Sequence, residues 1–75
     1  MNESLYCGWK VEVKLSGFGV FPAYVRSANN KKGKFSVLHA SGGMVVSRSD
    51  IVGILDKHRC KFDVVFEKAM SLRTH

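Results

Sequence analysis

The segment Trp9-Lys10-Val11-Glu12-Val13-Lys14-Leu15 alternates apolar and charged side chains with a period of two. This period is typical of a β-strand that has one face on a core and the other in water. The four apolar side chains of the segment are therefore predicted to point inward and the three charged ones outward. No other stretch of the chain carries so clear a signal.

Four more apolar runs follow, over residues 20–28, 35–40, 44–48 and 51–55, each bounded by Gly, Asn, Ser or Asp. Short strands punctuated in this way are typical of small all-β domains. The sequence predicts a mainly β fold, a five-stranded small barrel over residues 9–55. Pro22 cannot donate a hydrogen bond to a neighbouring strand, which predicts an edge position or a bulge there.

After the barrel the apolar period changes. Phe62, Val65, Phe66, Ala69 and Met70 recur at helical spacing, which predicts a C-terminal amphipathic helix over about residues 59–73. An alternating strand through Cys60, Phe62, Val64 and Phe66 is the alternative, and the good helix formers in residues 67–72 favour the helix. We expect the stripe, and Phe62 and Phe66 in particular, to be buried on an outer apolar surface of the barrel formed by Val20, Tyr24, Leu38 and Val46. Pairing with a second copy is the alternative use of the stripe.

The 75 residues have room for one domain, residues 1–75. Two cysteines without a CxxC pair or paired histidines do not match a zinc or disulfide framework, so we expect reduced thiols, no metal and no cofactor. No apolar run is long enough to span a membrane, and the first residues lack the basic start of a signal peptide. The predicted location is cytoplasmic, and the predicted state a monomer or homodimer.

The net charge is +6, which favours polyanionic partners. Residues 1–49 contain seven Lys and Arg against two acids, whereas the remaining residues contain five bases against four acids. The excess positive charge therefore belongs to the predicted barrel.

Three groups of residues carry a wider resemblance. Val11-Glu12-Val13, Ala23-Tyr24-Val25 and residues 43–51, set among a Gly-Phe-Gly loop, a basic hairpin and a Gly-Gly turn, resemble the SH3-like small barrels, which include the Tudor, KOW and Sm-like domains. The nearest named resemblance, over about half of the chain, is to the C-terminal Tudor-like domain of the ProQ RNA chaperones. It implies a small barrel with a binding role. ProQ's main RNA-binding domain has no counterpart in these residues, so chaperone activity is not implied.

The candidate binding residues centre on the loop 29–34. Four cations without an acid, Arg26, Lys31, Lys32 and Lys34, are predicted on this hairpin and the adjoining strand ends, where they match the electrostatic footprint of phosphate contacts. Outward-facing Lys10, Lys14 and Arg48 extend the set, although Glu12 interrupts it. A solvated loop that blocks aggregation at a sheet edge is the alternative.

Two aromatic side chains are candidates for base stacking. Phe18 is predicted at a turn tip and Tyr24 on an outward face, and bases stack on such rings. The structural alternative is that Phe18 caps an open barrel end and Tyr24 lies under the helix. An aromatic cage for a methylated amine would need several rings converging on one pocket.

The predicted function is therefore a non-catalytic module that binds RNA or DNA with weak sequence preference. His39, His58 and His75 have no acid or thiol partner at a catalytic spacing, and no nucleophile or phosphate-cradling motif stands out, so no enzyme is predicted. The alternative is a Tudor-like or SH3-like adaptor that binds a protein, from a phage or another mobile element.

Overall fold

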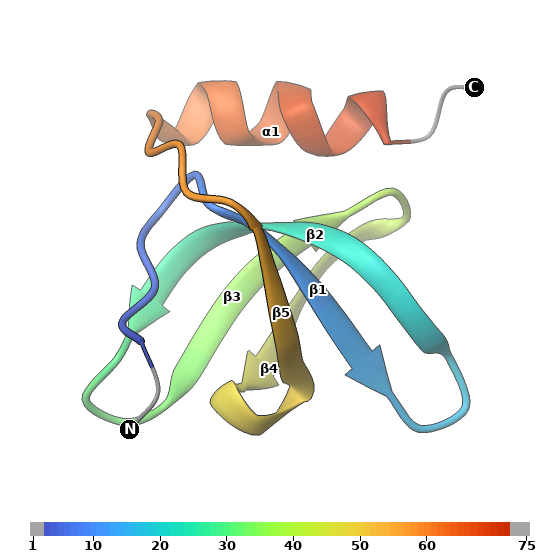
Figure 1. Cartoon of the computed structure of the whole chain (residues 1–75). Coiled ribbons are helices and arrows are strands. Elements are labelled where there is room, and N and C mark those ends of the chain that lie inside the picture. Colours follow the sequence, from blue (N-terminus) through green and yellow to red (C-terminus); the bar gives the residue numbers. More distant parts are fainter. Residues whose placement is uncertain (1–2, 73–75) are drawn as a thin grey trace.

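The computed structural model describes residues 3–72, which form five antiparallel strands followed by a helix (Figure 1). A single 3-10 turn, η1, joins the last two strands. The elements are β1 (Lys10–Leu15), β2 (Gly19–Asn29), β3 (Lys34–His39), β4 (Gly42–Ser47), η1 (Arg48–Asp50), β5 (Ile51–Asp56) and α1 (Phe62–Ser71). The mainly β fold with a C-terminal helix is confirmed. The helix is shorter than the predicted 59–73, whose last residue lies outside the described part, and the alternative of a strand there is wrong.

The strands make one sheet in the order β4-β3-β2-β1-β5, so the last strand of the chain pairs with the first. The sheet bends strongly on itself and gives the molecule a small barrel-like shape (Figure 1). Strand β1 is paired on both sides, so that Val11 lies opposite Ala23 of β2 and Ile54 of β5.

The inner face of the bent sheet holds the main core. The predicted alternation of β1 is confirmed, because Val11 and Val13 are fully buried, Trp9 is nearly so, and Leu15 packs at the edge of the core. The buried members of the core are Leu5, Trp9, Val11, Val13, Ala23, Val25, Phe35, Val37, Val46 and Ile51. Leu5 belongs to the segment before β1, residues 3–9, which we call the N-terminal arm.

A second, smaller core lies between α1 and the outer face of β2 and β3 (Figure 1). It contains Leu38, Val65 and Ala69, with Cys7, Tyr24 and Cys60 packed against them. The expectation that α1 covers an outer face of the barrel is therefore confirmed. Two of the residues predicted for that face are elsewhere, because Val46 points into the main core and Val20 is half-exposed.

The prediction that Phe62 and Phe66 are buried is wrong. Phe62 is 49% exposed and Phe66 52% exposed, whereas Val65 and Ala69 are the buried residues of α1. The small side chains of Val65 and Ala69 allow the helix to lie close to the sheet. At 100° per residue Phe66 is turned roughly 80° from the centre of this contact line, to the flank of the helix. Phe62 is the first residue of α1 and lies at its end. The guanidinium of Arg26 lies 5.6 Å from the centroid of the Phe62 ring, which places Arg26 beside the helix.

Pro22 lies in the central strand of the sheet, yet it is paired with a residue of only one adjacent strand. It is opposite Glu12 of β1, whereas the pairing of β2 with β3 begins at Tyr24. This part of β2 therefore behaves locally as a sheet edge, which is where a residue without an N–H is tolerated. The irregularity in the pairing of β2 with β3 lies further along, between Val25 and Ser27.

Candidate nucleic-acid interface

The hairpin between β2 and β3 is held by hydrogen bonds to Asn29. Its backbone oxygen accepts from the N–H of Gly33 at 2.9 Å, and its side-chain oxygen accepts from the N–H of Lys32 at 3.1 Å. Gly33 has a φ of +69°, a conformation that glycine adopts without strain. The tight turn leaves the side chains of Lys31 and Lys32 exposed at the tip.

The end of β4 joins this hairpin and adds a fourth cation. The N–H of Arg48 donates to the backbone oxygen of Gly33 at 2.9 Å, and the Nζ of Lys34 donates to the Oγ of Ser47 at 3.0 Å. Lys31, Lys32, Lys34 and Arg48, which we call the basic end, are thus gathered by the backbone of two separate turns. Lys31, Lys32 and Arg48 line one shallow depression of about 320 Å³. The acidic residue Glu3 lines it as well, together with Ser4, Asn30, Gly33 and Phe35.

The N-terminal arm lies along the side of the basic end. Asn30 makes two hydrogen bonds of 2.8 Å with the backbone of Leu5, one as donor and one as acceptor. The guanidinium of Arg48 donates to the backbone oxygen of Ile51 at 3.2 Å and to that of Glu3 at 3.4 Å. Arg48 is therefore fixed by carbonyl groups, which hold its orientation without neutralising its charge.

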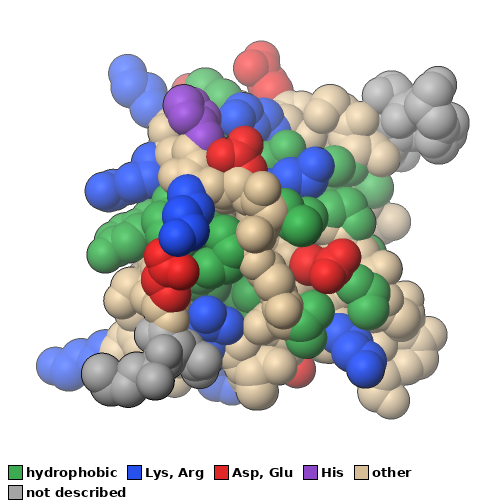
Figure 2. All heavy atoms as spheres, viewed as in Figure 1, with side chains coloured by type: hydrophobic (Ala, Val, Ile, Leu, Met, Phe, Trp, Pro, Cys, Tyr) green, Lys and Arg blue, Asp and Glu red, His purple; other side chains and the backbone are tan. Residues whose placement is uncertain are grey.

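Within residues 3–72 no cation of the basic end forms an ion pair with a carboxylate. The ion pair found there joins Lys57 to Glu3 at 2.7 Å, and so engages the carboxylate of a residue that also lines the depression. The carboxylate of Asp50 accepts from the backbone N–H of Ser47 at 3.0 Å. Figure 2 shows Lys and Arg side chains around much of this face of the molecule, including its lower left, where Figure 1 places the hairpin. Four exposed or half-exposed cations thus stand together with their positive charge unpaired.

The other predicted cations lie away from the basic end. Arg26 lies on the outer face of β2 beside Phe62, as described above. The Nζ of Lys10 is 5.8 Å from the centroid of the Tyr24 ring, and Lys14 is opposite Val20 near the other end of β2. None of these three residues lines the depression that Lys31, Lys32 and Arg48 share.

The two candidate stacking rings are also separated from the basic end. Phe18 precedes β2 whereas the hairpin lysines follow it, and eleven residues of strand lie between them. Tyr24 packs against the second core, with the Nζ atoms of Lys10 and Lys68 each 5.8 Å from its centroid. Burial, and then the charges of Asp56 and Cys60, raise the pKa of Tyr24. The position of Tyr24 matches the structural alternative, in which this ring lies under the helix, whereas Phe18 is 76% exposed.

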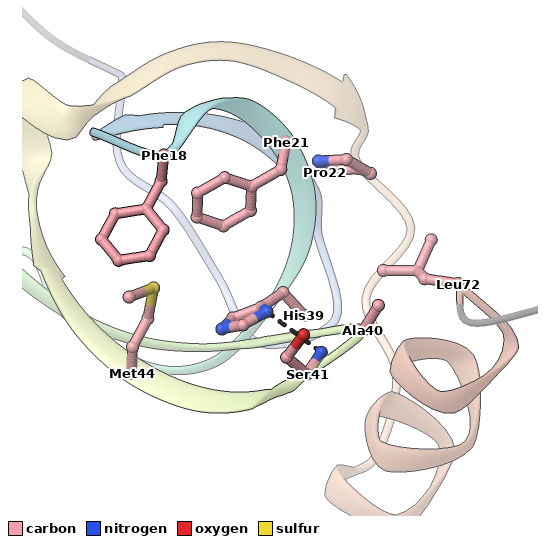
Figure 3. A pocket seen from close by; sticks show the side chains of 8 residues that line it. All are labelled: Phe18, Phe21, Pro22, His39, Ala40, Ser41, Met44 and Leu72. Atoms are coloured by element: carbon pink, nitrogen blue, oxygen red, sulfur yellow. Dashed lines mark hydrogen bonds between the residues drawn. The ribbon is translucent and has the colours of Figure 1, made fainter. Parts of the chain in front are cut away.

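Phe18 instead forms one wall of an apolar pocket of about 420 Å³ (Figure 3). The ring of Phe21 meets that of His39 edge to face, with centroids 5.2 Å apart. The Nδ1 of His39 accepts from the N–H of Ser41 at 3.2 Å, so a neutral His39 carries its proton on Nε2. The residues that line this apolar pocket are Phe18, Phe21, Pro22, His39, Ala40, Ser41, Met44 and Leu72.

Two of these arrangements are barely indicated by the sequence. The period of the strands does not show that two different turns and the end of α1 meet at one pocket. Asn30 lies in the predicted loop 29–34, and its side-chain amide also fastens the N-terminal arm. The sequence pattern at this position, an Asn-Asn pair before three lysines, does not indicate a contact with Leu5, which is 25 positions away.

Comparisons with protein-family models, with curated proteins and with solved structures return no match to this chain. Within residues 3–72 no group of three or more His, Cys, Asp or Glu side chains could hold a metal ion. Over the same part of the chain, no helix combines the length and the apolar character that crossing a membrane requires.

Proposed function

We propose that this protein is a non-catalytic nucleic-acid-binding module whose primary contact is the basic end. The observation that carries the proposal is the gathering of Lys31, Lys32, Lys34 and Arg48 on two adjoining turns, none of them in an ion pair within residues 3–72. Cations arranged in this way bind the phosphate backbone and release its counterions. The net charge of +6 and the resemblance to SH3-like barrels support the same function.

Binding would rest on phosphates more than on bases. Contacts to phosphate fix the position of a protein on a nucleic acid but carry no sequence information. Since Phe18 and Tyr24 lie elsewhere, stacking on these rings is not part of the primary contact. We therefore expect weak sequence preference, and comparable binding to RNA and DNA of equal charge.

The test is a triple substitution, Lys31/Lys32/Lys34→Ala, measured by fluorescence anisotropy with labelled RNA and DNA. The matched control is Lys14/Lys61/Lys68→Ala, which removes the same charge from other surfaces of the protein. Loss of binding in the first variant with retention in the second supports the proposal. Equal binding by the hairpin variant and the parent would mean that the basic end is not the site.

A second candidate function is supported by the apolar pocket. Its 420 Å³ lies in the range of about 300–1,000 Å³ that is usual for ligand pockets, and its lining is aromatic and aliphatic. This chemistry favours an adaptor that binds an apolar side chain of a protein partner. Such a partner would be captured equally in high salt and after nuclease treatment, and capture would be lost in Phe18→Ala, whose ring is 76% exposed and contributes little to the core.

A further inference from the structure

The two cysteines, 53 positions apart in the sequence, meet where the N-terminal arm crosses the segment before α1. The thiol of Cys7 donates to the backbone oxygen of Cys60 at 3.5 Å. Both side chains are half-buried and pack against the second core, beside Leu38, Val65 and Ala69. The sequence alone predicts reduced thiols and does not indicate that the two cysteines meet.

Gly8, the residue after Cys7, shows how closely the two segments approach. A β-carbon placed on Gly8 would lie 2.7 Å from the Sγ of Cys60 and would overlap its backbone nitrogen. Consecutive Cα atoms are about 3.8 Å apart, and a disulfide joins Cα atoms about 4.4–6.8 Å apart. The Sγ of Cys7 is 3.5 Å from the backbone oxygen of Cys60, and the Sγ of Cys60 faces the residue next to Cys7, so both thiols lie at the same crossing of the two segments.

We propose that Cys7 and Cys60 are a thiol pair that forms a reversible intramolecular disulfide and fastens the N-terminal arm to the base of α1. The oxidant is a small-molecule disulfide. One cysteine thiolate attacks it, forms a mixed disulfide and releases one small thiol. The second cysteine then loses its proton and attacks the protein sulfur of the mixed disulfide, which releases a second small thiol. Two protein thiols are oxidised and one small disulfide is reduced.

The surroundings of the pair set the conditions of the reaction. Burial, and then the charge of Cys60, raise the pKa of Cys7, while Arg59 lowers it. Because the thiolate is the attacking species, oxidation should accelerate as the pH rises toward the ordinary thiol value of 9.0. The bond would close a loop over all five strands, and such a cross-link should raise the melting temperature by roughly 10 °C.

The experiment is a titration of the reduced, full-length protein with oxidised glutathione, followed by acid quenching and intact-mass analysis. We expect a monomer that has lost two hydrogens, a Cys7–Cys60 cross-link in the peptide map, and full reversal by dithiothreitol. Each single variant, Cys7→Ser and Cys60→Ser, should instead retain one glutathione adduct, because the resolving thiol is missing.

Three results would overturn the proposal. They are a stable wild-type protein that carries two glutathione adducts, a disulfide-linked dimer at low protein concentration, and thiols that stay unreacted when folded but react in urea. The nucleic-acid assay is independent of this outcome, since the basic end lies on other turns.

Discussion

Gly8 is the residue at which the N-terminal arm, β2 and the segment before α1 come together. Its N–H donates to the backbone oxygen of Val25 at 2.8 Å, its φ is +97°, and a β-carbon there would overlap Cys60. Left-handed backbone costs a non-glycine residue about 1–2 kcal/mol, and the overlap adds to that. We expect Gly8→Ala to lower the free energy of unfolding by roughly 2 kcal/mol or more, as measured by urea denaturation.

Gly19 provides the matched control for this substitution. Its φ is +75°, but a β-carbon would meet no atom within 4 Å. Gly19→Ala should therefore show the conformational cost alone. Equal losses in the two variants would mean that the close approach to Cys60 contributes nothing to stability.

The thiol of Cys7 makes stability depend on pH. Its pKa is raised above the ordinary value of 9.0, first by burial and then by Cys60, so the folded protein retains this proton to higher pH than the unfolded chain. The contribution to stability is complete below pH 9.0 and is lost as the pH rises through the folded pKa. Urea denaturation under reducing conditions should show a steeper decline above pH 9.0 for the parent than for Cys7→Ser. Parallel declines would rule out this contribution, because the two proteins differ only at residue 7.

Neighbouring apolar residues of α1 differ sharply in how far they are buried. Val65 is fully buried and Phe66 is half-exposed, although both belong to the same predicted stripe. Val65→Ala should lower the free energy of unfolding by roughly 1.5–3 kcal/mol, and Phe66→Ala by about 1 kcal/mol or less. Thermal denaturation of the two variants beside the parent measures the difference. The reverse order would place the contact line of the helix on the phenylalanine side.

The sequence identified the elements better than it identified their contacts. The period of residues 9–15 gives the inward side of β1 directly, because a strand has only two faces. The five apolar residues of α1 span an arc wider than the contact, so the pattern could not say which of them meet the sheet. Lysines at 31, 32 and 34 are adjacent in the chain and were predicted together, whereas the distances of Phe18 and Arg26 from them depend on strand length and helix docking.

At the level of the whole molecule, the basic end should determine how binding responds to salt. The logarithm of the affinity falls with the logarithm of the salt concentration at a slope of about −0.9 per phosphate neutralised on duplex DNA. Four cations therefore predict a slope of roughly −3.6 for the parent and about −0.9 for Lys31/Lys32/Lys34→Ala. Anisotropy titrations over a series of potassium chloride concentrations give both slopes. A parent slope near zero would favour the adaptor function and the apolar pocket.

The pairing of the last strand with the first has a consequence for the folding rate. Lys10 is opposite Asp56 and Val13 opposite Ile51, so each contact between β1 and β5 joins residues 38 to 46 positions apart in the sequence. Proteins dominated by such distant contacts fold in about milliseconds to seconds, because chain entropy is lost before the contact is gained. Until β5 arrives, the free side of β1 is an open edge on which a strand of another molecule can dock. Refolding yield should therefore fall as protein concentration rises, and the kinetic competition between β5 and a neighbouring chain would limit recovery.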